Sequence, residues 1–173
     1  MKKLYLVRHA KSSHDNNTLP DIERTLNKRG LRDAPYMAKL MKKKGVTPTL
    51  FISSPAVRAL TTAKLFAAEM NYNKEEILID PVLYSFIADQ ILAFIAETQI
   101  QAESVMLFSH NPTITEIVNF FTGEQIFSMP TCAIAAIQFD VEKWSEVGYH
   151  KGKLIFMEYP KLHKDKLGEV EDD

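Results

Sequence analysis

Four side chains suited to binding and attacking a phosphate group occur in three short stretches of the sequence. Arg8 and His9 are adjacent, Arg58 follows about fifty residues later, and His110 comes after a third stretch. Two arginines offer forked, permanently charged donors to one phosphate group. A neutral imidazole can attack phosphorus while a second, cationic imidazole stabilises the developing charge. The residue types therefore indicate phosphate chemistry with a histidine nucleophile.

Each of these stretches directly follows a short run of apolar residues, at 4–7, 50–52 and 105–108. Unbroken apolar runs of this length are typical of strands that are covered on both faces in a parallel sheet. Ligands of open α/β sheets bind at the carboxyl ends of such strands. We therefore expect the arginines and histidines to meet at one edge of the sheet.

The second and third runs are each followed by a helix signal. Ser54 could cap a helix with Pro55 in its first position, and Asn111 and Pro112 repeat this pattern. Gly123 is a plausible end of the later helix. These helix N-termini would add backbone N–H donors beside the phosphate.

The remaining pattern predicts helices over residues 27–44 and 85–97 and strands over 77–79, 133–139 and 154–159. Pro35 inside the first helix implies a kink or a later start near Asp33. The alternation of strands and helices predicts an α/β fold, a three-layer α/β/α sandwich with a mostly parallel central sheet. We expect one domain over residues 1–160 and a solvated, charged tail over 161–173.

Composition limits the possible partners and the location. With 173 residues, 46% apolar and 25% charged, the chain suits one globular domain. Its net charge of −1 gives no global field for a polyanion, so we expect no nucleic-acid or membrane partner. The apolar run before Arg8 has only four residues, 4–7, too few for a signal peptide, which favours a cytoplasmic location.

Neither cysteine nor histidine spacing suggests a metal. Cys132 is the single cysteine, and the five histidines form no close HxxxH pair. The sequence also lacks a Walker motif, GxGxxG and a carboxylate trio for magnesium. We therefore expect no metal and no cofactor. His14, His150 and His163 lie in polar, turn-like surroundings and are interpreted as surface residues.

The motifs resemble those of the histidine phosphatase (phosphoglycerate mutase-like) superfamily. Arg8-His9-Ala10 resembles its RHG signature, residues 53–63 its SSPxxRAxxTA element, and residues 109–112 its SHxP element. Residues 23–30 are similar to its RPLxxRG stretch, and the small size is similar to the SixA-like branch. The resemblance implies a phosphoglycerate mutase-like fold. It also implies that His9 accepts the phosphoryl group, that Arg8, Arg58 and His110 complete the pocket, and that Arg24 lies at its rim.

Two departures from the family pattern bear on the substrate. Ala10 replaces the signature glycine, and the added methyl group puts substrate fit in question. Larger relatives carry a glutamate proton donor in an insertion that this chain lacks, and Asp89 is a weak substitute, so the acid stays unassigned. A phosphoramidate bond to imidazole breaks more readily than an alkyl phosphate without such an acid.

The resulting hypothesis is a metal-independent phosphatase that works through a covalent phosphohistidine. A SixA-like protein phosphohistidine phosphatase is the preferred reading, and the partner would be a phosphorylated protein or a small phosphorylated metabolite. A phosphate-binding module with weak catalysis and a small phosphoglycerate mutase-like enzyme are the alternatives. A neutral His9 beside a cationic His110 would give a bell-shaped rate profile at mildly acidic to neutral pH.

Overall fold

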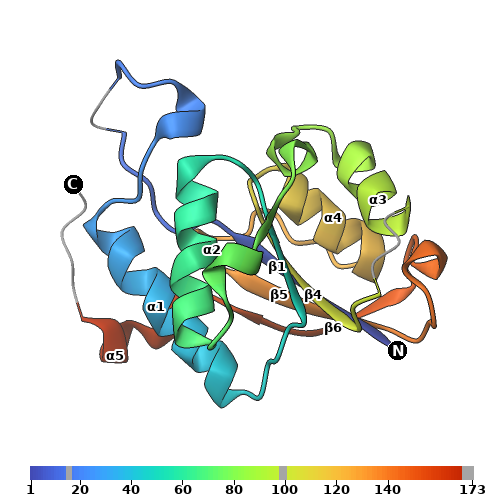
Figure 1. The fold of residues 1–173 in the computed structure, drawn as a ribbon. Coiled ribbons are helices and arrows are strands. Elements are labelled where there is room, and N and C mark those ends of the chain that lie inside the picture. The colour runs from blue at the N-terminus through green and yellow to red at the C-terminus, as the bar shows by residue number, and fades with distance from the viewer. Residues whose placement is uncertain (15–16, 98–100, 169–173) are drawn as a thin grey trace.

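The computed structural model describes residues 1–14, 17–97 and 101–168, and a single mixed sheet organises them (Figure 1). Its six strands are β1 (Lys2–Arg8), β2 (Leu50–Ser53), β3 (Leu78–Ile79), β4 (Ser104–Ser109), β5 (Ile134–Phe139) and β6 (Gly152–Glu158). The helices are α1 (Lys28–Lys43), α2 (Val57–Glu69), α3 (Ala88–Glu97), α4 (Thr113–Thr122) and the short α5 (Lys164–Leu167). The predicted α/β class is confirmed.

The strand order β3-β2-β4-β1-β5-β6 places the three apolar runs next to one another. β1, β2, β3 and β4 are parallel, and β5 and β6 add an antiparallel edge. Arg8 pairs with Ser109, and Ser53 pairs with Phe108, so β1, β2 and β4 end at the same level. The residues that follow these three strands are thereby brought together.

Alternate residues of the central strands face two separate cores, which produces the three layers. In β1, Leu4 and Leu6 belong to the core under α3 and α4, whereas Tyr5 and Val7 belong to the core under α1 and α2. Figure 1 shows the two helix pairs as separate groups. Because both faces are covered, the central strands carry continuous apolar runs instead of an alternating pattern.

The structure rules out the predicted alternative in which helix α1 starts only near Asp33. The helix begins at Lys28, and the Asn27 side chain accepts a hydrogen bond from the Gly30 N–H. Pro35 lies inside the helix. A proline removes one backbone donor, but the apolar side of α1, which includes Met37 and Met41, is fully buried and keeps the helix against the sheet.

Helices α2 and α4 both begin later than predicted. α2 starts at Val57 after an extended Ala56 rather than at Pro55, and Ser54 does not cap it. α4 starts at Thr113 and lacks a side-chain cap. Gly123 ends α4 in the left-handed conformation, as predicted. Ser54 and Asn111, the two predicted caps, are therefore available for other contacts at the carboxyl end of the sheet.

The predicted tail begins with a 3₁₀ turn over Pro160–His163 and helix α5. Arg32 of α1 donates a hydrogen bond to the Gly168 carbonyl at 2.7 Å. Residues 169–173, the acidic end of the tail, lie outside the described residues. Of the helices that are described, none combines the length and the apolar character needed to cross a bilayer.

Candidate active site

The side chains at the carboxyl ends of β1, β2 and β4 line one pocket of about 270 Å³. His9 donates its backbone N–H to Ser109, and Ser54 donates its backbone N–H to Phe108. These bonds extend the sheet by one residue and fix where the following side chains start. All five predicted site residues are among those that line the pocket: Arg8, His9, Arg24, Arg58 and His110.

His9 is held with a defined tautomer. Its Nδ1 lies 2.7 Å from the carbonyl oxygen of Ala10, and because a carbonyl only accepts, Nδ1 carries the proton. In the neutral ring, Nε2 then has the free electron pair. Burial, followed by the nearby His110, Arg58 and Arg8, lowers the His9 pKa to about 3. The ring is therefore neutral at pH 7, as a nucleophile must be.

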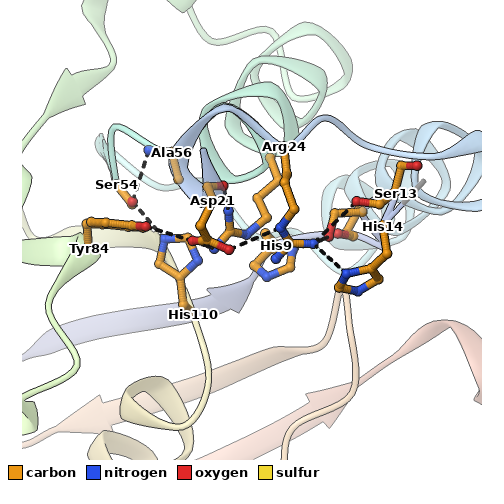
Figure 2. Close-up of polar contacts among 12 residues, drawn as sticks. His9, Ser13, His14, Asp21, Arg24, Ser54, Ala56, Tyr84 and His110 are labelled. Carbon is orange, nitrogen blue, oxygen red and sulfur yellow. Dashed lines mark hydrogen bonds and ion pairs between the residues drawn. The ribbon is translucent and has the colours of Figure 1, made fainter. Parts of the chain in front are cut away.

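His110 lies beside His9, with 5.3 Å between the ring centroids (Figure 2). Its Nε2 is 2.7 Å from Ser54 Oγ, while its buried Nδ1 has no partner in the described chain. Burial, followed by the charge of Arg58, lowers the His110 pKa to about 3. This differs from the expected cationic ring. A phosphate dianion beside it would raise the pKa, because an opposite charge favours the protonated form.

The two central arginines present donors toward the same space. Arg58 is buried, and Arg8 is half-buried. Arg8 donates from Nη1 to the Met129 carbonyl at 2.7 Å. The Nε atoms of Arg8 and Arg58 are buried and, within the described chain, have no hydrogen-bond partner. An unpaired buried donor is costly, so these two N–H groups and His110 Nδ1 together favour an anionic ligand with several acceptor oxygens.

Asp21 is a site residue that the sequence analysis missed. Its backbone carbonyl accepts from Arg58 Nη1 at 2.7 Å, and its carboxylate accepts from Arg58 Nη2 at 3.0 Å. Arg24 and Tyr84 also donate to this carboxylate (Figure 2). The Tyr84 hydroxyl, followed by Arg58, holds the Asp21 pKa well below its usual range. Asp21 is therefore an anion that fixes Arg58, not a ready proton donor.

The rim contains further polar groups. Arg24 Nη1 donates to Ser12 Oγ at 2.8 Å and lies 3.3 Å from His14 Nδ1. His14 is exposed, as predicted, but it also lines the pocket. His150 is exposed too. His163 departs from the predicted surface position, since it is half-buried and lies 2.8 Å from the Glu158 carboxylate.

Neither Ala10 nor Asp89 lies in the pocket wall. Ala10 is fully buried and donates its N–H to Thr62 Oγ1, so its methyl group packs in the core and not against a substrate. Asp89 is exposed in the first turn of α3 and does not line the pocket, which argues against it as the acid. Among the residues described, no group of three or more His, Cys, Asp or Glu side chains could hold a metal ion.

Comparison with known proteins agrees with this geometry. A family model described as histidine phosphatase superfamily (branch 1) matches residues 4–84. The chain is also similar to a crystal structure from Agrobacterium tumefaciens provisionally described as the phosphohistidine phosphatase SixA. That likeness has a TM-score of 0.77 and 25% identity, and it covers 92% of this chain and 98% of that one. The chain belongs to the histidine phosphatase superfamily. The predicted enzyme class, a phosphatase, is thereby confirmed.

Two further proteins are similar to this chain, the first in fold and the second in sequence. A protein histidine phosphatase SixA complexed with tungstate has a TM-score of 0.80 at 22% identity, over 94% of this chain and 99% of that one. An uncharacterized chloroplastic protein of Arabidopsis thaliana is 29% identical over 155 residues, 84% of this chain and 70% of its own length. The phosphoglycerate mutase-like, SixA-like architecture is thus confirmed.

Proposed function

We propose that this histidine phosphatase forms a covalent phosphohistidine on His9 and releases phosphate to water, without a metal ion. The observation that carries the proposal is the His9 ring. Its Nδ1–H donates a hydrogen bond to the Ala10 carbonyl, so the free electron pair is on Nε2. The lowered pKa keeps the ring neutral. Arg8, Arg58 and His110 surround the same pocket and offer three unpaired buried nitrogens to the phosphate oxygens.

The first step forms the bond between His9 Nε2 and phosphorus and breaks the bond to the leaving group. Arg8 and Arg58 stabilise the charge on the equatorial oxygens, and Arg24 contributes from the rim. When the Ser54 hydroxyl donates to Nε2, neutral His110 donates a hydrogen bond from Nδ1 to the phosphate. Once the bound phosphate dianion has raised its pKa, the His110 imidazolium can give a proton to the leaving group. Water then attacks phosphorus and returns a proton to His110, the bond between His9 Nε2 and phosphorus breaks, inorganic phosphate leaves, and His9 is neutral again.

A phosphohistidine on a protein is the substrate class that we propose. Asp21 is the one carboxylate among the lining residues described, and its lowered pKa makes it a poor acid. An imidazole leaving group needs less acid assistance than an alkoxide, because its ring nitrogen is readily protonated. The likeness to proteins described as SixA supports the same class. A cytoplasmic location stays a prediction.

A substrate panel tests this proposal. Phosphate release is measured in the presence of chelator from a phosphohistidine peptide, a phosphoserine peptide, a sugar phosphate and a nucleotide. We expect the phosphohistidine peptide to be the best substrate and His9→Ala to be inactive toward all four. Retained turnover in His9→Ala would overturn the nucleophile. Preference for the sugar phosphate would favour an enzyme of metabolites, and binding of phosphate without any release would leave a phosphate-binding module.

A further inference from the structure

Two phenylalanine side chains are exposed where the rest of this residue type is packed. Among the phenylalanines described, only Phe86 and Phe127 are exposed, at 61% and 101% of the full surface. Ile87, beside Phe86, is 55% exposed. Scattered exposed apolar residues are ordinary. These three are notable because of the segments that carry them.

Both segments help to build the phosphate pocket. Phe86 lines it and packs against Tyr84 with 5.9 Å between ring centroids, and Tyr84 packs against His110 at 5.4 Å. Figure 2 shows Tyr84 beside His110. Phe86 therefore belongs to the pocket wall and is also exposed to solvent, and an exposed Ile87 directly follows it.

Phe127 belongs to a second segment that contributes to the pocket. The next residue, Ser128, accepts a hydrogen bond from Asn111 Nδ2 at 2.9 Å. Met129 then accepts from Arg8, and Asn111 and Thr131 line the pocket. Phe127 thus stands on the chain that holds Arg8 and Asn111 in place, yet its own side chain contacts almost nothing.

A ligand confined to the pocket does not reach a side chain that is wholly in solvent. Among ligands that bind in the pocket, only one that also extends over the rim can cover Phe127 and Ile87. We propose that Phe86, Ile87 and Phe127 form an apolar rim that docks apolar side chains flanking the phosphohistidine of a protein substrate. This inference rests on the proposed function. The negative charge of the phosphoryl group complements the arginines that line the pocket. Aromatic residues are common anchors of protein interfaces.

Two synthetic phosphohistidine peptides test the rim directly. They are identical except that the residues flanking the phosphohistidine are leucine in one and serine in the other. We expect the wild-type protein to prefer the leucine peptide in kcat/KM by about tenfold or more, the gain from covering one large apolar side chain. Equal rates for the two peptides would overturn the rim proposal and leave the proposed function standing. Hydrolysis of neither peptide would overturn both.

A double variant shows whether the rim causes the preference. Ile87→Ser/Phe127→Ser changes two residues that do not line the pocket, so hydrolysis of p-nitrophenyl phosphate should stay within about twofold of wild type. The preference for the leucine peptide should disappear. The matched control is Ile155→Ser/Leu162→Ser, which removes two side chains that are 49% and 55% exposed and lie outside the pocket. An unchanged preference in Ile87→Ser/Phe127→Ser, or its loss in the control, would contradict the proposal.

A second copy of this chain is the other candidate to cover the rim. Sedimentation of the wild-type protein and of Ile87→Ser/Phe127→Ser over a range of concentrations separates the two occupants. We expect the same sedimentation behaviour for both proteins. A wild-type dimer that the double variant loses would assign the rim to self-association and overturn docking of a substrate.

Discussion

Two clefts lie at opposite ends of β1, and both are lined by cationic side chains. At the carboxyl end, Arg8 and Arg58 are fixed by backbone carbonyls, and each keeps a buried Nε without a partner in the described chain. At the amino end, Lys3 is exposed, and Lys44 Nζ lies 3.1 Å from the Glu158 carboxylate. Both clefts are therefore positively charged, but among the residues described only the cleft at the carboxyl end has buried side-chain N–H donors that lack an acceptor.

The difference indicates what makes a phosphate site. Exposed or paired ammonium groups are already satisfied by water or by a carboxylate and gain little from an anion. Buried guanidinium N–H groups that lack an acceptor gain a great deal. The capacity to bind phosphate therefore depends on buried donors without an acceptor and not on positive charge alone.

The largest effect is expected when one cationic side chain is removed from each cleft and the two losses are compared. Arg58→Ala should lower kcat/KM for p-nitrophenyl phosphate by about 10²- to 10³-fold, because the charge that develops on the phosphoryl oxygens loses a fixed donor. Lys44→Ala should stay within about twofold of wild type. Steady-state kinetics measures both. Comparable losses would mean that general positive charge, not buried donors, carries the site.

A smaller effect is expected from the anion that positions Arg58. Asp21→Asn keeps the shape but removes the charge opposite Arg58, Arg24 and Tyr84, and we expect kcat/KM to fall by about tenfold. Because Asp21 is a positioning residue and not the acid, the loss should be equal for aryl phosphates with good and with poor leaving groups.

The control for this variant is Tyr84→Phe, which removes one donor to Asp21 and leaves the pair with Arg58 intact. Its loss should be smaller. If the defect of Asp21→Asn grows steadily as the leaving group becomes more basic, Asp21 donates the proton, and the assignment as a positioning residue fails.

Acidification should destabilise the histidine cleft. The folded-state pKa of His9 and His110 is about 3, whereas a histidine in the unfolded chain titrates near ~6.5. Between these values the unfolded state binds more protons, so the free energy of unfolding falls as pH falls. We expect a loss of about 2 kcal/mol per histidine between pH 7 and pH 5.

Urea denaturation at a series of pH values measures this loss. His9→Gln should show a flatter dependence than wild type, since one of the two buried imidazoles is gone. Lys3→Ala should keep the wild-type dependence, because Lys3 is exposed and none of the described residues that line its cleft is a histidine. A wild-type protein whose stability is constant between pH 5 and pH 7 would contradict the lowered pKa values.

The smallest effect concerns Ala10, whose methyl group belongs to the core behind the pocket. Ala10→Gly should leave kcat/KM within about twofold of wild type and lower the free energy of unfolding by about 1 kcal/mol, from one lost buried methyl group and added chain freedom. Kinetics and urea denaturation measure the two quantities. A large gain in activity would mean that this methyl group does restrict the substrate.

The sequence predicted the parts of the site that follow buried strands. Arg8, His9 and His110 come directly after apolar runs, and Arg58 lies in the first turn of the next helix, so topology alone brings them together. Their catalytic roles stay proposals. Composition and spacing also predicted the three-layer fold, because continuous apolar strands need helices on both faces.

The residues that the sequence missed are held by tertiary contacts. Asp21 lies in a short 3₁₀ turn without apolar periodicity, and only folding brings it to Arg58 and Tyr84. The sequence favours Ser54 as a helix cap, but α2 starts at Val57. The Ser54 hydroxyl accepts a hydrogen bond from the Ala56 N–H and contacts His110 Nε2. The position of this serine, directly after a strand end, is the one sequence feature that could have indicated a role in the site.

The most direct test of the account is to trap the phosphoryl group on the protein. Mixing the protein with an aryl phosphate, quenching within one turnover in alkaline denaturant and mapping the peptides by mass spectrometry locates the modified residue. The account predicts a phosphoryl group on His9 that disappears when substrate is exhausted and never forms in His9→Ala. Turnover with no phosphorylated His9, or with the group on His110 instead, would contradict it.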